Sequence, residues 1–88
     1  MKGITMFVLK TCPHCVIANK YIAQLRAEDS RYAAVQILEI DEREQRALAD
    51  SYDYWYVPSF YLGKQKLHEG HAEYEDIKKV FDAALLAE

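Results

Sequence analysis

Residues 10–15 read Lys10-Thr11-Cys12-Pro13-His14-Cys15 and contain both cysteines of the chain, with only Pro13 and His14 between them. Such a pair can be two metal ligands, two buried apolar residues, or one redox centre. A disulfide between Cys12 and Cys15 would close a loop of only a few residues, so it would restrict the unfolded chain little and add little stability. A purely structural crosslink is therefore a poor interpretation of this motif.

The composition describes one small soluble domain. The chain has 88 residues, of which 51% are hydrophobic and 28% charged, and this is typical of a single domain with a modest core. No repeat and no linker-like stretch divides it, so we predict one domain over residues 1–88. The net charge is −3, with acidic and basic residues interleaved. This pattern favours neither a nucleic-acid nor a membrane surface, and we expect a monomer.

The beginning of the chain bears on the expected compartment. Its first residues, MKGITMFVLK, do not have the pattern of a signal peptide. Nowhere do about 18 apolar residues follow one another, as a membrane span requires. We therefore expect a cytoplasmic, reducing compartment, where a cysteine pair is more often catalytic or metal-binding than structural.

The first half of the chain predicts a strand, a helix and a second strand. Residues 4–9 and 33–40 are short apolar runs with β-branched members, which suit strands covered on both faces. Between them Ala18, Ile22 and Leu25 recur at helical spacing, and this predicts a helix over 13–28. The two strands should pair in parallel through a right-handed crossover.

The second half predicts a helix, a hairpin and a final helix. Asp41 and Glu44 have the spacing of an N-cap and its capping-box partner, which predicts a helix over 41–51. Residues 60–62 and 66–68 flank a Gly-Lys pair and indicate a hairpin. The final helix carries one apolar stripe, formed by Ile77, Val80, Phe81, Ala84 and Leu85. The predicted fold class is α/β, with a four-stranded mixed sheet, about three helices and the order β-α-β-α-β-β-α.

The cysteine motif falls where the first predicted strand ends and the first predicted helix begins. Pro13 suits the first helical position, which needs no backbone N–H, so Cys12 should be the N-cap and Cys15 should lie one turn inside. The unpaired N–H groups and the helix dipole should stabilise the thiolate of Cys12. His14 and Lys10 should add positive charge beside it. Cys12 is thus the candidate nucleophile, and Cys15 is the candidate resolving thiol.

A metal site is the competing interpretation of the motif. A lone Cys-x-x-Cys supplies only half of a tetrahedral zinc site, and the further candidate ligands are His14, His68 and His71. His14 is held between the cysteines and cannot easily join them as a third ligand, while His68 and His71 read as solvated loop residues. The sequence therefore favours redox chemistry, with no metal and no tightly bound cofactor.

The sequence resembles the glutaredoxins, a family with the thioredoxin fold, over nearly the whole chain. Three landmarks carry the resemblance: residues 12–15, CPHC, after the first strand; Tyr56-Val57-Pro58 before the third; and residues 69–73, EGHAE, before the last helix. The resemblance implies that the peptide bond before Pro58 is cis and that the Val57 backbone lies beside the first cysteine. The N–H and C=O groups of Val57 would then pair with the extended backbone of a substrate cysteine.

The same resemblance implies glutathione as a cosubstrate. Its cysteinyl part would lie on the segment Tyr56-Val57-Pro58, and its γ-glutamyl carboxylate would meet the start of the last helix, since helix N-termini bind carboxylates. The residues implied at this second position are Gly70, His71 and Ala72. Glu73 would take the α-amino group, and Lys10 would meet the glycyl carboxylate.

The chain departs from the family at several of these positions. Glu69 stands where glutaredoxins have glycine, His14 replaces the usual tyrosine, and Tyr56 replaces a threonine. The Pro-His dipeptide also resembles that of the periplasmic disulfide-forming oxidases. Since a more stable thiolate makes the disulfide a stronger oxidant, we expect an oxidising shift relative to thioredoxin.

The resemblance thus implies a glutaredoxin-like thiol-disulfide oxidoreductase. The Cys12 thiolate would attack protein or glutathione mixed disulfides, and Cys15 or glutathione would release the product. Two alternatives stay open: a thioredoxin-like redoxin that is reduced by a flavoprotein reductase, and an iron-sulfur carrier. In the carrier, Cys12 from two subunits and two glutathione molecules would hold the cluster.

An aromatic run precedes the second landmark and comprises Tyr52, Tyr54, Trp55 and Tyr56. Tyrosine and tryptophan are enriched in protein-protein interfaces, so the run is a candidate docking surface for protein substrates. It can equally be a loop whose rings cover the second helix and the sheet edge. We expect some rings to do each.

Overall fold

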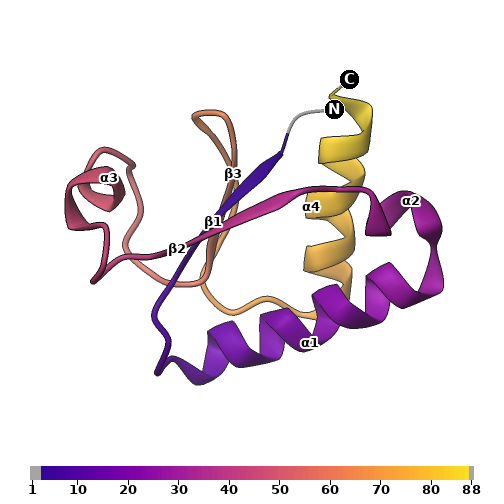
Figure 1. The fold of residues 1–88 in the computed structure, drawn as a ribbon, viewed down its shortest axis with the longest axis horizontal. Helices are drawn as coiled ribbons and strands as arrows, with labels where there is room; N and C mark the ends of the chain where they lie inside the picture. Colours follow the sequence, from indigo (N-terminus) through magenta and orange to yellow (C-terminus); the bar gives the residue numbers. More distant parts are fainter. Residues whose placement is uncertain (1–2, 88) are drawn as a thin grey trace.

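The computed structural model describes residues 3–87 and contains a four-stranded sheet with the strand order β2-β1-β3-β4 (Figure 1). Strand β1 (Ile4–Val8) pairs in parallel with β2 (Ile37–Asp41) and antiparallel with β3 (Ser59–Leu62). Strand β4 (Gln65–Glu69) pairs antiparallel with β3, and their turn contains Gly63 at φ 62°. The predicted mixed sheet and its hairpin are confirmed.

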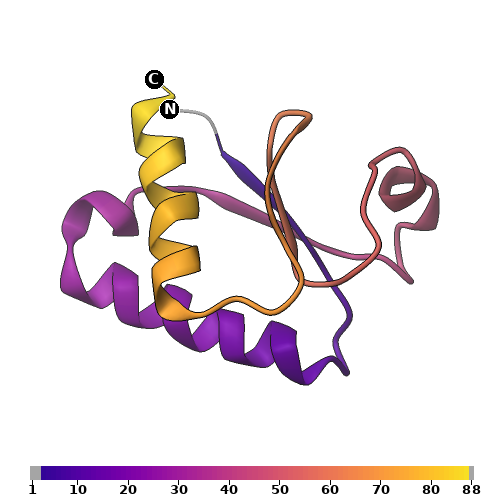
Figure 2. The same cartoon turned by 180° about the vertical axis from the view of Figure 1, so that it is seen from behind.

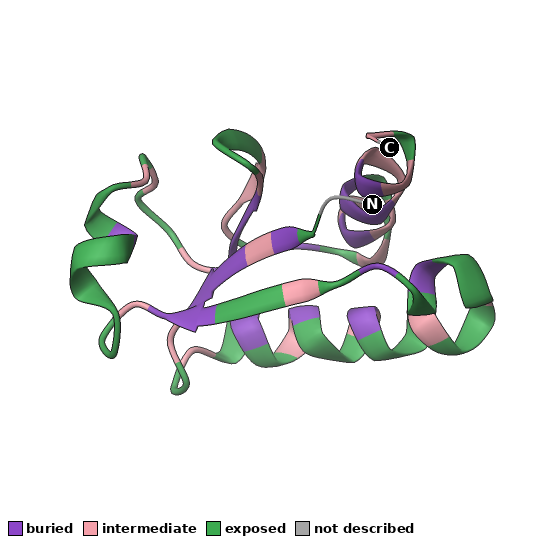
Figure 3. Ribbon diagram, turned by 45° about the horizontal axis from the view of Figure 1, so that its top comes forward, coloured by how far each residue is buried: buried purple, intermediate pink, exposed green. Residues whose placement is uncertain are grey.

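Two long helices, α1 (Pro13–Glu28) and α4 (Tyr74–Leu86), pack on one face of this sheet (Figure 2). Figure 3 shows that the buried positions of α1 lie on its side toward the strands. The shared core includes Ile4, Met6, Val8, Ala18, Ile22, Leu25, Phe60, Ile77, Val80, Phe81 and Ala84. The predicted helix over 13–28 and the apolar stripe of the last helix are therefore confirmed. Within residues 3–87, no helix combines the length and apolar composition of a membrane span.

The opposite face of the sheet is covered by the short helix α3 (Arg46–Asp50) and by the aromatic run that follows it. The Tyr54 ring stacks on Phe7 with 5.0 Å between centroids, and the Tyr52 ring approaches Phe7 at 4.7 Å. The buried members of this second cluster are Phe7, Ile40, Ala49 and Tyr61. Tyr52 and Tyr54 thus belong to the packing of the domain.

An additional helix, α2 (Ser30–Ala33), lies between α1 and β2, so the order is β-α-α-β-α-β-β-α. The side chain of Asp29 accepts a hydrogen bond from the Arg31 backbone N–H at 2.8 Å and caps this turn. Tyr32 is buried against α4, and its hydroxyl donates to Asp82 at 2.5 Å. The prediction of a strand from residue 33 and of a seven-element order is therefore wrong, because the first residues of that apolar run complete a helical turn instead.

The predicted capping box at Asp41 and Glu44 is also wrong. Asp41 is the last residue of β2, and its carboxylate accepts from the backbone N–H groups of Arg43 at 2.8 Å and Lys10 at 3.2 Å. These donors hold the pKa of Asp41 below its usual value. Helix α3 begins only at Arg46. The carboxylate therefore joins the end of β2 to the end of β1 and does not start a helix.

Candidate active site at the start of helix α1

Cys12 is the N-cap residue of α1, as predicted. Its backbone is extended, with φ −84° and ψ 117°, and Pro13 occupies the first turn. The Cys12 N–H donates to the Leu9 carbonyl at 3.0 Å, and the Cys15 N–H donates to the Cys12 carbonyl at 3.1 Å. The turn at the end of β1 thus presents the Cys12 side chain at the open end of the helix, where it is only partly buried.

Cys15 lies one turn further and is 3% exposed within the main core. Burial is the largest cause that raises the pKa of the Cys15 thiol to about 12, and the neighbouring Cys12 thiol acts in the same direction. A hydrogen bond with the Leu9 backbone opposes this shift. Cys15 is therefore a neutral thiol at neutral pH, so the two cysteines of the motif occupy different environments.

The segment before β3 lies against Cys12. The Val57–Pro58 peptide bond is cis, as predicted, and the carbonyl oxygen of Val57 is 3.9 Å from the Sγ atom of Cys12. Pro58 is fully buried, and its carbonyl accepts from the Gly70 N–H at 2.8 Å. Gly70 has φ 88°, a conformation that favours glycine. The backbone that follows Val57 is thus held by Gly70, next to the sulfur atom.

Glu69, at the end of β4, holds the loop that leads into this segment. Its carboxylate accepts from the backbone N–H groups of Trp55 at 2.5 Å and Tyr56 at 2.9 Å. It also pairs with the Lys66 ammonium group at 2.7 Å, which is the largest cause that lowers the pKa of Glu69. The Glu69 carboxylate is therefore paired with the loop amides and with Lys66. The residues around Glu69 in the sequence do not indicate that its carboxylate binds the loop amides.

The side chains of Trp55 and Tyr56 extend from the same loop into solvent. They are 84% and 70% exposed, respectively. The aromatic run is thus divided: Tyr52 and Tyr54 pack on the sheet, while Trp55 and Tyr56 are free of the core. Of the aromatic run, only these two residues stay candidates for a docking surface, on the loop that leads to Val57.

The histidines form a connection that the residue patterns did not predict. The Nδ1 atom of His14 lies 2.9 Å from the Nδ1 atom of His71, and the Nε2 atom of His71 is bound to the carboxylate of Glu73. The Nε2 atom of His68 lies 2.9 Å from the His71 carbonyl oxygen. The prediction of a solvated loop residue is confirmed for His71, which is exposed in the loop before α4, and is wrong for His68, which lies on β4 and is half-buried.

The remaining residues implied for glutathione binding are placed as follows. The Lys10 ammonium group is bound to the carboxylate of Glu44, which is the main cause that raises the pKa of Lys10. Ala72 is fully buried in the core, and Glu73 is the N-cap residue of α4. Of the residues implied for glutathione binding, those from Gly70 to Glu73 lie together before α4, next to His14. The Lys10 side chain is instead paired with Glu44.

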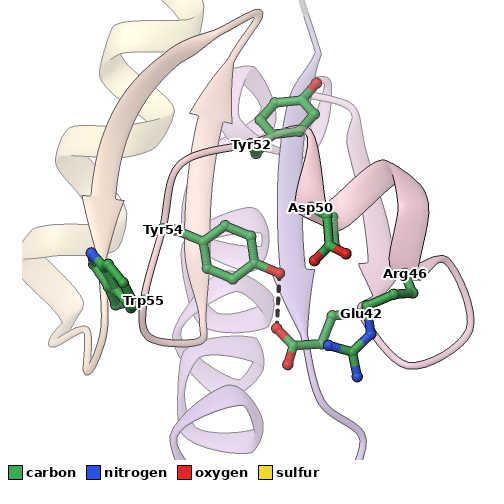
Figure 4. Close-up of a pocket in the computed structure, with 7 residues that line it drawn as sticks. Glu42, Arg46, Asp50, Tyr52, Tyr54 and Trp55 are labelled. Carbon is green, nitrogen blue, oxygen red and sulfur yellow. Dashed lines mark hydrogen bonds between the residues drawn. The ribbon is translucent and has the colours of Figure 1, made fainter.

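A pocket of about 240 Å³ lies on the α3 face of the molecule (Figure 4). It is lined by Glu42, Arg46, Ala49, Asp50, Tyr52, Tyr54 and Trp55. The Tyr54 hydroxyl donates to Glu42 at 2.8 Å across it. Neither cysteine contributes to this pocket, so it is separate from the thiol pair and shares with the thiol site only the loop that carries Trp55.

Comparisons with known proteins found a similar fold but did not assign the protein to a family. No protein-family model matches the chain, and no curated protein matches it. A solved structure described as "Structure of a malarial protein" has a TM-score of 0.68 to this chain at 16% sequence identity, covering 93% of this chain and 94% of that chain. The likeness is one of fold. It supports the α/β architecture of residues 3–87.

Proposed function

We propose that this chain is a glutaredoxin-like thiol-disulfide oxidoreductase with a thioredoxin-like fold. The observation that carries the proposal is the position of a partly exposed Cys12 at a helix start, 3.9 Å from the carbonyl oxygen of a residue that precedes a cis-proline. A disulfide substrate needs an accessible nucleophilic sulfur together with backbone groups that align it. Cys12 supplies the sulfur, and Val57 supplies the backbone groups.

The chemistry uses the different environments of the two cysteines. The Cys12 thiolate attacks one sulfur of the substrate disulfide, forms a mixed disulfide and releases the other sulfur as a thiolate, which takes up a proton. The Cys15 thiol then loses its proton and attacks the Sγ atom of Cys12. The second substrate thiolate leaves, and a Cys12–Cys15 disulfide remains. The substrate has gained two electrons, and two thiol groups of an external reductant return the protein to its dithiol form.

The identity of that reductant separates two candidate functions. Two charged groups that the resemblance assigns to glutathione are paired on the surface with side chains of this protein: Lys10 with Glu44, and Glu73 with His71. This observation favours the second candidate, a thioredoxin-like redoxin that takes its electrons from a flavoprotein reductase. In both candidates Cys12 and Cys15 have the same roles.

The test compares two cysteine variants on two substrates. Cys12→Ser should abolish reduction of every disulfide, because it removes the nucleophile. Cys15→Ser should accumulate mixed disulfides with protein substrates, and should keep deglutathionylation activity only if glutathione completes the second step. Turnover with glutathione and its NADPH-dependent reductase, compared with thioredoxin reductase, then identifies the electron donor. Undiminished turnover in Cys12→Ser would refute the proposal.

A further inference from the structure

Three side chains form one hydrogen-bonded series that starts in the cysteine motif and ends in the loop before α4. His14 belongs to the first turn of α1, and His71, 57 residues later, belongs to the loop before α4. Their Nδ1 atoms are 2.9 Å apart, and the two rings meet edge to face at an interplanar angle of 78°. The far nitrogen of His71 is bound to Glu73. The hydrogen-bonded order is therefore His14, His71, Glu73, and His14 follows Cys12 by two residues in the motif.

The geometry limits where hydrogen atoms can be. A carboxylate only accepts, so the Nε2 atom of His71 must carry a hydrogen to bond with Glu73. Two Nδ1 atoms bond to each other only if one carries a hydrogen and the other does not. In the uncharged pair, the hydrogen between the rings must therefore belong to His14, because His71 already carries its single hydrogen on Nε2.

The pair can accept one additional proton without losing a bond. With that proton on the Nε2 atom of His14, the positive charge resides on His14, two residues after Cys12 in the motif. If the hydrogen between the rings moves from one Nδ1 atom to the other, the same charge resides on His71, next to Glu73. A second additional proton would place hydrogens on both Nδ1 atoms and break the bond. The hydrogen-bonded histidine pair thus holds one positive charge that can move between the two rings.

Other polar groups around these three side chains have hydrogen-bond partners of their own. His68, on β4, donates from Nε2 to the His71 carbonyl oxygen. Asp76, on α4, accepts from the backbone N–H of Glu73 at 3.0 Å. Within the motif, the two thiols closest to His14 in the sequence are the partly buried Cys12 and the buried Cys15. Cys12 is the group of this set whose charge changes during thiol-disulfide exchange, since its thiolate becomes a neutral disulfide.

We propose that His71 and Glu73 are positioning residues of the thiol site that act through His14, by holding its ring and by moving one positive charge between Glu73 and Cys12. This inference rests on the proposed function, since it concerns the reactivity of Cys12. When Cys12 is a thiolate, the charge is on His14 and stabilises it. When Cys12 is in a disulfide, the charge is on His71, where the Glu73 carboxylate stabilises it.

The first test measures alkylation of Cys12 by iodoacetamide, which forms a thioether and releases iodide, in a Cys15→Ser background between about pH 5 and about pH 9. His71→Gln should move the rate profile to higher pH and slow alkylation at about pH 6 by about two- to fivefold. The effect is modest because the side chains of His71 and Glu73 are 43% and 64% exposed. Glu73→Gln should shift the profile in the same direction, and Glu75→Gln, a matched loss of one carboxylate in the first turn of α4, should leave it unchanged.

A double-mutant cycle shows whether His71 acts through His14. In a His14→Gln background, His71→Gln should have no further effect on the alkylation profile. An equal effect of His71→Gln in both backgrounds, or no effect in either, would overturn the proposal. Thermal unfolding of each variant checks that the fold is kept.

The movement of the charge has a direct spectroscopic readout. On oxidation of the dithiol, the ¹⁵N resonances of the His14 and His71 rings should shift in opposite directions, while those of His68 stay unchanged. Unchanged His14 and His71 resonances would refute charge movement. Alkylation requires no disulfide turnover, so a protein that shows the coupling but reduces no disulfide refutes only the proposed function. A protein that reduces disulfides without the coupling refutes only this inference.

Discussion

The Sγ atom of Cys12 lies 3.9 Å from the carbonyl oxygen of Val57, although 45 residues separate them in the sequence. The contact joins the start of α1 to the loop before β3, and both segments are fixed by further backbone hydrogen bonds. In the proposed function, a substrate sulfur bound to Cys12 would therefore lie beside the Val57 carbonyl oxygen. Four predictions examine the parts of this arrangement separately.

The buried Cys15 thiol should make the protein less stable as the pH rises above about 8. The pKa of Cys15 is raised to about 12 from an ordinary value of 9.0, with burial as the largest cause. Below the ordinary value the thiol is neutral in both states, so its contribution to stability is complete. As pH rises toward 12, the unfolded chain ionises first and this contribution is lost. Reduced Cys12→Ser should therefore lose stability more steeply than Cys12→Ser/Cys15→Ala between about pH 8 and about pH 10, as measured by urea unfolding. Identical slopes would show that Cys15 is not shielded from water.

Glu69 should control how the loop before Val57 presents substrate. Glu69→Ala removes the acceptor for the Trp55 and Tyr56 N–H groups, and the Michaelis constant for a protein disulfide should rise about three- to tenfold. Glu69→Gln keeps an acceptor oxygen and should recover most of this loss. Lys66→Met removes only the ion pair and serves as the control. If Lys66→Met were as damaging as Glu69→Ala, the ion pair and not the loop amides would be the important contact.

The exposed and packed aromatic residues should respond differently to truncation. Trp55→Ala and Tyr56→Ala should raise the Michaelis constant for a protein disulfide by about tenfold, as expected for exposed interface aromatics. They should change neither the reduction of a small disulfide nor the free energy of unfolding. Tyr54→Ala should instead lower the free energy of unfolding by about 2 kcal/mol, because its ring stacks on Phe7. Equal activity of Trp55→Ala and the parent protein on several protein disulfides would argue against a docking role.

Two glycines with positive φ offer a matched comparison. Gly70→Ala and Gly63→Ala should each lower the free energy of unfolding by about 1–2 kcal/mol, because both backbones lie in the left-handed region. Only Gly70 donates to the Pro58 carbonyl and lies before α4. Gly70→Ala should therefore also lower the specific activity, measured well below the unfolding temperature, whereas Gly63→Ala, in the hairpin turn, should not. A similar activity loss in both would indicate a general effect of stability.

Local patterns were sufficient for the elements that bury an apolar stripe of their own. Pro13 marks the start of α1, and the spacing of Ala18, Ile22 and Leu25 predicts its length, because these signals come from residues within one helix. The final helix follows from the same periodicity. The cysteine pair was placed correctly at the helix start for the same reason, since a proline at the first turn defines its immediate neighbours.

The wrong predictions came from sequence patterns that are compatible with more than one local structure. Aspartate is a common helix N-cap, but the carboxylate of Asp41 accepts hydrogen bonds from the backbone N–H groups of Lys10 and Arg43 and does not start a helix. Residues 30–33 form helix α2 because Asp29 caps the turn and Tyr32 fills a space against α4. In both cases one deciding partner lies far away in the sequence, Lys10 for Asp41 and α4 for Tyr32, and periodicity within the segment does not reveal it.

By itself, the sequence determined the mixed sheet, the two long helices and the position of Cys12 at a helix start, because burial periodicity and proline geometry act over a few residues. Only the tertiary structure decided which charged and polar side chains pair. Glu69 binds the loop amides of Trp55 and Tyr56, and His14 meets His71. These contacts depend on strand register and on how α1 and α4 pack against the sheet. Residues far apart in the chain become neighbours only once that packing is complete.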